Sequence, residues 1–296
     1  MLCLSSGAIF SEIKALILNN YTRGQYFRTY PDIMKKKEEA KYLDKEWDAM
    51  NLHLKAFLET GDQEALHKFR VQIKKLRAML FLFENTSKEN GLLKHFKPVR
   101  KIFKYAGNIR DAHTNLELGE RYQVKNEQFE TGQHQKIEQG TLEFKSKSEE
   151  FVKNIKNAHK KLKKQLHKVD DTLIADYYKN QLNQIATNLA VSGFNEDMHT
   201  NRKLIKILVY NHKIAERSLN GSVPFNLAYL DKLQETIGKW HDNLLAEELF
   251  SLPELNDKPI VNKIKRVNSG IKRKISTLAD DFLKKATTPD TTIKAR

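Results

Sequence analysis

The chain has 296 residues, of which 40% are hydrophobic and 30% charged, and its formal net charge is +15. This composition is that of a soluble globular protein and excludes overall disorder, while the length suffices for about two domains or one domain in two halves. The positive charge favours a polyanionic partner, either nucleic acid, an acidic membrane or polyphosphate, and does not choose among them.

Turn-forming residues are scarce, because Gly (12) and Pro (6) together are about half as frequent as in an average protein. Few turns indicate long helices, so we predict an all-α fold. A single cysteine, Cys3, excludes an internal disulfide, and residues 1–20 resemble neither a signal peptide nor a membrane span. The expected location is the cytoplasm, without a membrane partner.

Helical patterning begins near Met34, so residues 1–33 are expected to be a loosely attached extension or a start-site artefact. The pattern predicts a first helix over 33–59 and a second over 63–85, with Asp62 as the N-cap of the second. The second helix has one continuous apolar stripe, formed by Leu66, Phe69, Ile73, Leu76, Leu80 and Phe83. A basic stripe, rotated from the apolar one by about 100°, is formed by His67, Arg70, Lys74 and Arg77.

The segment that follows repeats this arrangement from about residue 96. We expect Gly107 to mark a helix end or a tight contact, and Asp111 to cap the next helix. Residues 120–140 are rich in Gln, Glu, Lys and Gly, which indicates a weakly packed helix extension or a linker. The apolar stripe of the segment is Phe96, Val99, Phe103 and Ala106, and its basic side is Lys97, Arg100, Lys101 and Lys104.

The second part of the chain is predicted to be helical with a frayed tail. Its expected helices cover about 141–170, 172–191, 196–218, 225–250 and 259–285, with Asn195 before the third. Two runs, 153–168 and 258–274, each hold seven Lys or Arg and no acid. These runs are either solvated faces or part of a binding surface. The predicted organisation is an extension over 1–33, helical halves over 34–140 and 141–286, and a tail over 287–296.

An internal repeat is the most informative feature of the sequence. LHKFRVQIK at 66–74 aligns with MHTNRKLIK at 198–206, and AGNIRD at 106–111 aligns with IGKWHD at 237–242. The interval from His to Gly is 40 residues in the first copy and 39 in the second. Two motifs that agree in order and spacing indicate two related helical halves.

These two motif helices and paired Gly-x-x-[Arg/His]-Asp segments resemble the CHAD family, the conserved histidine α-helical domain, over roughly residues 34–285. The resemblance implies two four-helix bundles related by a pseudo-twofold axis, which enclose a basic central channel where inorganic polyphosphate binds. By motif position it implicates His67, Arg70, Lys74 and Arg77, with His199, Arg202 and Lys206 in the second copy. There Ile207 and Val209 stand where Lys75 and Arg77 stand in the first, so the first half is expected to contribute more charge.

Repeated cations suit a polyanion because side chains three and four residues apart share a helix face, about 5–6 Å from one another. Several such stripes facing one another would focus a positive potential in a cleft. We therefore predict non-catalytic polyphosphate binding, with no cofactor or metal, by a protein of the cytoplasm that associates with polyphosphate granules. The candidate binding residues are His67, Arg70, Lys74, Lys75, Arg77, Arg100, Lys101, Lys104, Arg110, His199, Arg202, Lys203, Lys206, Lys265 and Arg266.

Several interpretations of single residues stay open. His67 and His199 are either phosphate ligands, half-buried structural histidines or metal ligands. Asp111 and Asp242 are either helix caps or partners that orient a basic side chain, or they take part in catalysis.

Two other functions are alternatives to polyphosphate binding. One is a metal-dependent phosphohydrolase using His199 and His241-Asp242, which is less favoured because the repeat places Arg110 where His241 stands. The other is a nucleic-acid-binding helical protein, which is less favoured because the aromatic residues near the motifs lie on or beside core stripes.

Overall fold

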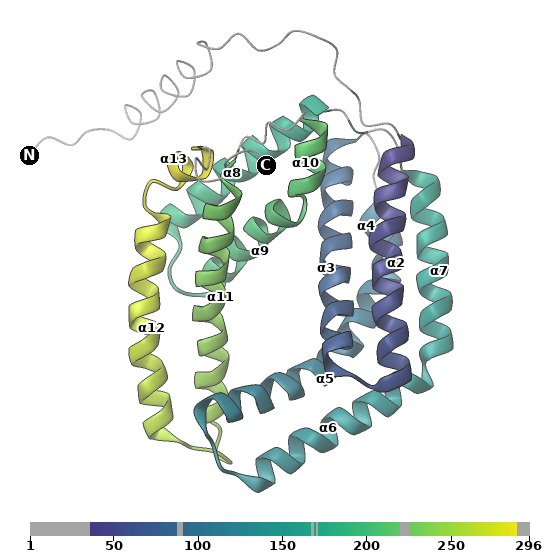
Figure 1. Ribbon diagram of the computed structural model, residues 1–296. Helices are drawn as coiled ribbons and strands as arrows, with labels where there is room; N and C mark the ends of the chain where they lie inside the picture. The colour runs from purple at the N-terminus through teal and green to yellow at the C-terminus, as the bar shows by residue number, and fades with distance from the viewer. Residues whose placement is uncertain (1–35, 88–90, 167–168, 170, 220–224, 289–296) are drawn as a thin grey trace, which may run out of the picture. The chain divides into compact units, whose positions relative to one another are not determined.

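The computed structural model describes residues 36–87, 91–166, 169, 171–219 and 225–288, and within these ranges the regular elements are all helices (Figure 1). The predicted all-α fold is confirmed. None of the described helices is long and apolar enough to cross a bilayer. The helices are α2 (Lys36–Thr60), α3 (Gln63–Thr86), α4 (Leu92–His95), α5 (Lys97–Tyr122), α6 (Glu127–Ser146), α7 (Ser148–Gln165), α8 (Asp171–Val191), α9 (Glu196–Tyr210), α10 (His212–Ser218), α11 (Leu227–Phe250), α12 (Lys258–Ala279) and α13 (Phe282–Thr287).

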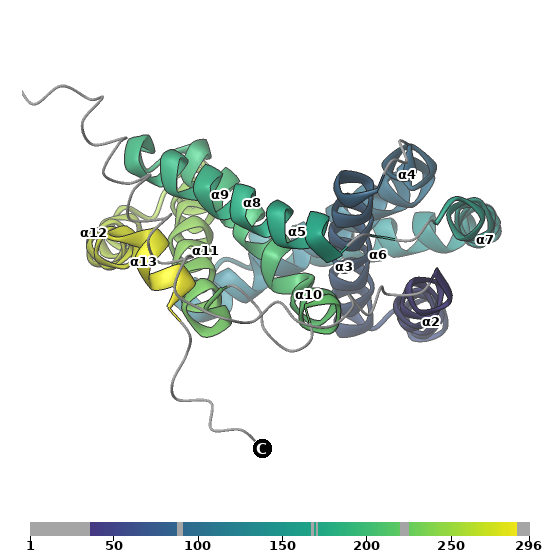
Figure 2. The same cartoon turned by 90° about the horizontal axis from the view of Figure 1, so that it is seen from above.

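The helices that carry the repeat pack in matching pairs. In the first half α3 packs on α2 and α5, and α5 packs on α6; in the second half α9 packs on α8 and α11, and α11 packs on α12. The two halves meet where α3 packs on α9 and α5 on α11, so α3, α5, α11 and α9 form a closed ring of contacts (Figures 1 and 2). The pseudo-twofold relation between two four-helix bundles, with a basic channel, stays a prediction.

Capping residues fix where both motif helices begin. The Asp62 carboxylate accepts hydrogen bonds from the backbone N–H groups of Glu64 and Ala65 at the start of α3. The Asn195 side chain accepts one from the N–H of Asp197 at the start of α9. These bonds satisfy N–H groups that lack an intrahelical partner. The predicted N-cap at Asp62, and the predicted start of a helix directly after Asn195, are confirmed.

The core extends through both halves of the chain. All six residues of the apolar stripe predicted for α3 are at most 2% exposed, which turns the basic stripe beside them towards the core boundary. The α9–α10 junction is bound to the first half by a buried hydrogen bond of 2.9 Å from the Asn211 side-chain amide to the carbonyl of Ala78 in α3. A smaller apolar cluster joins the ends of α5, α11 and α12 through Leu118, Ala246, Leu249, Phe250 and Ile264.

The predictions for residues 107–140 are partly wrong. Gly107 does not end a helix but makes a tight contact, the other alternative predicted for it. Asp111 does not cap a helix, because α5 continues to Tyr122 with a buried face that includes Ile109. The segment predicted to be a weakly packed helix extension or a linker contains the end of α5 and most of helix α6. Gly140 of α6 serves close packing, because a Cβ there would lie 2.8 Å from the Ile109 side chain, whereas nothing lies within 4 Å of one on Gly132. Gly140 thus lets α5 and α6 approach each other.

Three predicted helices are each divided in two. The helix expected over 141–170 is divided at Lys147 between α6 and α7, and the one over 196–218 at Asn211, where the side chain bonds to α3. The helix over 259–285 ends at Ala279, and Asp281, with a φ of 51°, precedes α13. The expected extension over 1–33 lies outside the described residues, as does the tail from residue 289 onward.

Candidate functional site

The two copies of the motif place four cations together. Arg70 and Lys74 on α3 and Arg202 and Lys206 on α9 form what we call the central cation cluster, at the contact between these two helices. Burial lowers the pKa of Lys74 to about 8, with further lowering by Arg70, Lys206 and Arg202. Lys74 nevertheless keeps more than a third of its surface exposed, so water partly screens this repulsion.

No member of the cluster forms an ion pair with a carboxylate in the part of the chain that the structure describes. Asp111 on α5 is the acid whose charge acts on the cluster, and it raises the pKa of both Arg70 and Lys74. Burial outweighs this effect at both residues. The cluster therefore retains an excess of positive charge for which an anion is the natural partner.

Both cluster arginines are anchored to the backbone of the next helix in the ring. Arg70 Nη1 donates a 2.7 Å hydrogen bond to the carbonyl of Phe103 on α5, and its guanidinium carbon lies 4.1 Å from the centre of the Phe103 ring. Arg202 Nε donates a 3.1 Å hydrogen bond to the carbonyl of Gln234 on α11. Each arginine thus commits one donor to the protein and keeps others available.

The motif histidines have different neighbours in the two halves. Burial lowers the pKa of His67, and the positive charge of Arg110 lowers it further. In the second half the His199 ring stacks on His241, with ring centres 4.0 Å apart. Burial and the neighbouring His241 lower the pKa of His199 to about 4, so His199 is neutral near pH 7. His199 Nδ1 is buried without a hydrogen-bond partner among the described residues.

Residues of the two Gly-x-x-[Arg/His]-Asp segments lie within helices. Arg110 contacts His113 Nδ1 at 2.6 Å and Glu117 at 2.9 Å, so an acid already offsets its charge. Asp111 and Asp242 are exposed on α5 and α11, and neither caps a helix. Asp111 fits the other interpretation, that of an electrostatic partner for a basic side chain, here Arg70. In the described ranges no three His, Cys, Asp or Glu side chains group closely enough to hold a metal ion.

The remaining candidates on α3 and α5 form an outer basic surface. The charge of Arg100 on α5 lowers the pKa of Arg77 after the larger effect of burial, so the two charges are close enough to interact. Lys101 and Lys104 are exposed on α5. We call Arg77, Arg100, Lys101 and Lys104 the outer basic surface.

Other predicted binding residues are engaged elsewhere. Lys203 pairs with Glu196 at 3.0 Å, and Lys265 pairs with Glu247 at 3.5 Å. Arg266 is exposed on α12, where its Nε donates to the carbonyl of Asn262. In the basic run on α7, Lys163 bonds with Asp44 on α2 at 2.6 Å, so part of that run holds helices together. Nothing places these residues in the central cation cluster.

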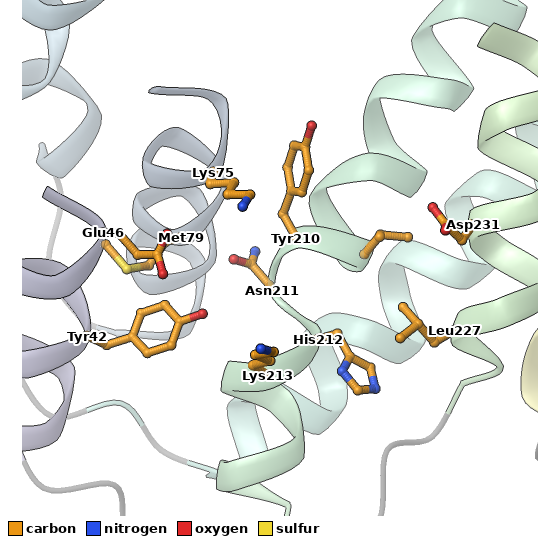
Figure 3. Close-up of a pocket in the computed structure, with 11 residues that line it drawn as sticks. Tyr42, Glu46, Lys75, Met79, Tyr210, Asn211, His212, Lys213, Leu227 and Asp231 are labelled. Carbon is orange, nitrogen blue, oxygen red and sulfur yellow. The ribbon is translucent and has the colours of Figure 1, made fainter. Parts of the chain in front are cut away.

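A pocket of about 280 Å³ lies beside the contact between α3 and α9 (Figure 3). Lys75 of α3 lines it together with Tyr42 of α2, Tyr210 of α9, Lys213 of α10 and Asp231 of α11. Its acids and bases are mixed, in contrast to the cation cluster. Lys75 therefore points to a different environment from that of its neighbour Lys74, as expected for consecutive positions on a helix that are rotated by about 100°.

The sequence did not reveal two elements of this site. Phe103 supports Arg70 through both its ring and its carbonyl, although its position in the apolar stripe indicated a core residue. His241 stacks on the motif histidine, and the sequence had grouped these two residues only in the less favoured phosphohydrolase alternative. A carbonyl that accepts a side-chain bond carries no sequence signal at all.

Comparisons with known proteins found one matching family and a solved structure with a similar fold. Residues 41–251, well over half of the chain, match the family described as the CHAD domain. The crystal structure of the CHAD domain from the plant Ricinus communis is similar with a TM-score of 0.60 at 14% sequence identity, over 88% of this chain and 96% of that one. At this identity the likeness bears on the fold alone. A search among curated proteins found no match.

Proposed function

The chain belongs to the CHAD domain family, and on this premise we propose that it binds inorganic polyphosphate, without catalysis, through the central cation cluster. The observation that carries the proposal is the meeting of Arg70, Lys74, Arg202 and Lys206 at the contact of the two motif helices. Repulsion among these like charges destabilises the protein without ligand, and a bound anion would relieve that repulsion.

The chemistry of polyphosphate fits cations carried by helices. The ligand is a flexible chain with a negative charge on each phosphate, so its receptor needs donors at repeated spacing more than a shaped pocket. Arg70 and Lys74 are four residues apart on α3, as are Arg202 and Lys206 on α9, and such pairs share a helix face. Arginine adds a planar fork of donors that matches phosphate oxygens.

The same proposal extends the ligand over the outer basic surface. The charges of Arg77 and Arg100 are close enough to interact there, and Lys101 and Lys104 are exposed on the same helix as Arg100. A long chain that leaves the central cluster would meet these side chains next. We propose a cytoplasmic protein that associates with polyphosphate granules and has no membrane partner.

Nucleic acid is a less favoured ligand. Proteins that hold single strands stack the bases on exposed aromatic side chains. Phe69, Phe83 and Phe96, which lie near the motif in the sequence, are at most 1% exposed and belong to the core. Phe103 is half-buried, but the Arg70 guanidinium already lies against its ring. Phosphate contacts without stacking therefore fit this site better.

Titration of long-chain polyphosphate, duplex DNA and single-stranded DNA at two salt concentrations tests the proposal. We expect polyphosphate to bind most tightly, with an affinity that falls steeply with salt because cations on the protein displace counterions. Binding of DNA at micromolar or lower concentration, with none of polyphosphate, would contradict the proposal.

A pair of charge-matched variants locates the site. Arg70→Glu with Lys74→Glu should weaken polyphosphate binding by at least about 100-fold, because two charge-assisted contacts are lost. Lys160→Glu with Lys164→Glu makes the same change in net charge at exposed positions of α7. Both proteins should keep their helical circular dichroism. Equal losses of affinity in the two variants would show that net charge alone, and not the cluster, governs binding.

A further inference from the structure

Two glycines occupy unusual places in the ring of helices. Gly107 lies inside α5 and Gly238 inside α11, and both are buried. Neither has a positive φ, so the backbone conformation does not require glycine. Glycine within a helix is less stable than alanine. The reason for glycine at these two positions must therefore be the space that a side chain would occupy.

An arginine fills that space in each case. A Cβ atom on Gly107 would lie 2.9 Å from Nη1 of Arg70, and one on Gly238 would lie 2.7 Å from Nη2 and 3.0 Å from Nε of Arg202. Each guanidinium thus lies directly against the backbone of the facing helix. We call these two pairs the arginine–glycine contacts.

The hydrogen bonds of the arginines obey the same rule in both halves. Arg70 donates to the carbonyl of Phe103 and Arg202 to that of Gln234, and each acceptor is four residues before the glycine of its own helix. Other helix-interior glycines differ, since the space beside Gly140 holds an Ile109 side chain and that beside Gly270 is open. The repeated geometry is specific to the two motif arginines.

We propose that Gly107 and Gly238 are positioning residues of the anion-binding site, each of which lets an arginine lie flat on the facing helix with its remaining donors directed to phosphate. This inference rests on the proposed function, because it assigns a role within the same site. A guanidinium fixed before the ligand arrives loses less conformational entropy on binding than a free one. A side chain on either glycine displaces the arginine and removes that advantage.

The binding test compares alanine at the glycines with alanine at the arginines. Gly107→Ala should weaken polyphosphate binding by about tenfold or more and reduce the salt dependence by about one phosphate contact. In the Arg70→Ala background the same glycine substitution should cause no further loss. Gly238→Ala should behave likewise with Arg202→Ala. Gly270→Ala on α12, where nothing lies within 4 Å of the added atom, is the matched control and should bind as the unmodified protein does.

A thermal test decides the inference independently of any ligand. In the unmodified background Gly107→Ala should lower the melting temperature, because the new methyl group meets the guanidinium. In the Arg70→Ala background it should raise the melting temperature by about 2–4 °C, since the space is empty and alanine favours the helix. The double variant also avoids the collision, so it remains folded for this measurement.

The outcomes separate the two hypotheses. Failure of the unmodified protein to bind polyphosphate overturns the proposed function, and a thermal effect of the same sign in both backgrounds overturns the arginine–glycine contact. Loss of binding in Arg70→Ala together with unchanged affinity in Gly107→Ala sustains the function and refutes the positioning role. Reversal of the thermal effect together with coupled losses of binding supports both.

Discussion

The two halves of the molecule repeat their central contact and differ in what surrounds it. Each half anchors one arginine on a glycine and a carbonyl of the facing helix. Beside the motif histidine, the first half places Arg110 and the second half places His241. The outer basic surface also belongs to the first half, where Arg77 occupies the position that Val209 has in the second.

This difference shows that the sequence meets one requirement at the arginine–glycine contacts and another at the residues that flank them. The arginine–glycine contact combines residues that are 37 positions apart in the first half and 36 in the second, so changing one member alone leaves a collision or an empty space. The flanking residues differ between the halves. The first half has the fixed charge of Arg110 beside its motif histidine, whereas the second half has a titratable histidine pair. The two halves should therefore contribute equally to polyphosphate binding through the central cation cluster, and unequally through the residues that surround it.

The largest expected effect tests equality at the centre. Arg70→Ala and Arg202→Ala should each weaken polyphosphate binding by about 10- to 100-fold, because each removes one charge-assisted contact. Isothermal titration at constant salt would compare the two variants directly. Arg266→Ala on the exposed face of α12 is the control and should have little effect. A loss confined to Arg70→Ala would show that the second half only supports the fold.

Much of the fold was predictable because its signals are local and periodic. The apolar stripe of α3 has a helical period over six residues, and all six are in the core. Asp62 is a capping residue directly before that stripe, and the helix begins there. The repeat also indicated which helices correspond, and the paired contacts of α3 with α5 and of α9 with α11 agree with it.

The misplaced features depend on contacts between distant segments. Gly107 indicated either a helix end or a tight contact, and Gly140 indicated a linker, because glycine usually interrupts helices. Both instead lie within helices, where they make room for a side chain of a neighbouring helix. Asn211 divides a helix by bonding to Ala78, which lies far away in the sequence. The partners of Lys203 and Lys265 were likewise invisible, since one basic residue in a run resembles another until an acid lies beside it.

The His199–His241 pair should have a smaller effect, a dependence of polyphosphate affinity on pH, which further distinguishes the second half from the first. In the free protein, burial lowers the pKa of His241, and burial and His241 lower that of His199 to about 4, so both are neutral near pH 7. Glu196 and Asp242 act in the opposite direction, while Arg202 and Lys203 add to the lowering. A bound polyanion favours the charged form and raises these pKa values. Binding then takes up protons, so affinity should rise as the pH falls from about 8 to about 6.

Variants that exchange the residue types at Arg110 and His241 would test this dependence of affinity on pH. His241→Arg gives the second half the fixed charge of the first, so affinity at about pH 8 should rise a few-fold and vary less with pH. Arg110→His should do the reverse, more weakly, because Glu117 already offsets the charge of Arg110. Affinities measured at several pH values, at constant ionic strength, are required. Identical pH profiles for all three proteins would eliminate the histidine pair as a source of the difference.

The smallest expected effect concerns the stability of the free protein. The pKa of Lys74 is about 8 in the folded chain against a reference value of 10.5, so between these values the unfolded chain binds more protons. Stability attributable to Lys74 therefore rises with pH over this interval, and the full repulsion persists below it. Lys74→Met should then stabilise the protein near pH 7 by about 1 kcal/mol, after discounting for solvent exposure.

That gain corresponds to an increase of about 2–4 °C in melting temperature, and it should vanish well above pH 10.5, where the lysine is neutral in both states. The same variant should bind polyphosphate more weakly, because the repulsion that it removes is the charge that attracts the ligand. Lys160→Met on the exposed face of α7, outside both proposed binding surfaces, is the control and should change neither property by much. A lower melting temperature for Lys74→Met near pH 7 would mean that the cluster is not under repulsion in the free protein. In that case, the packing of α3 on α9 would explain by itself why the four cations meet, and no bound anion would be needed to explain it.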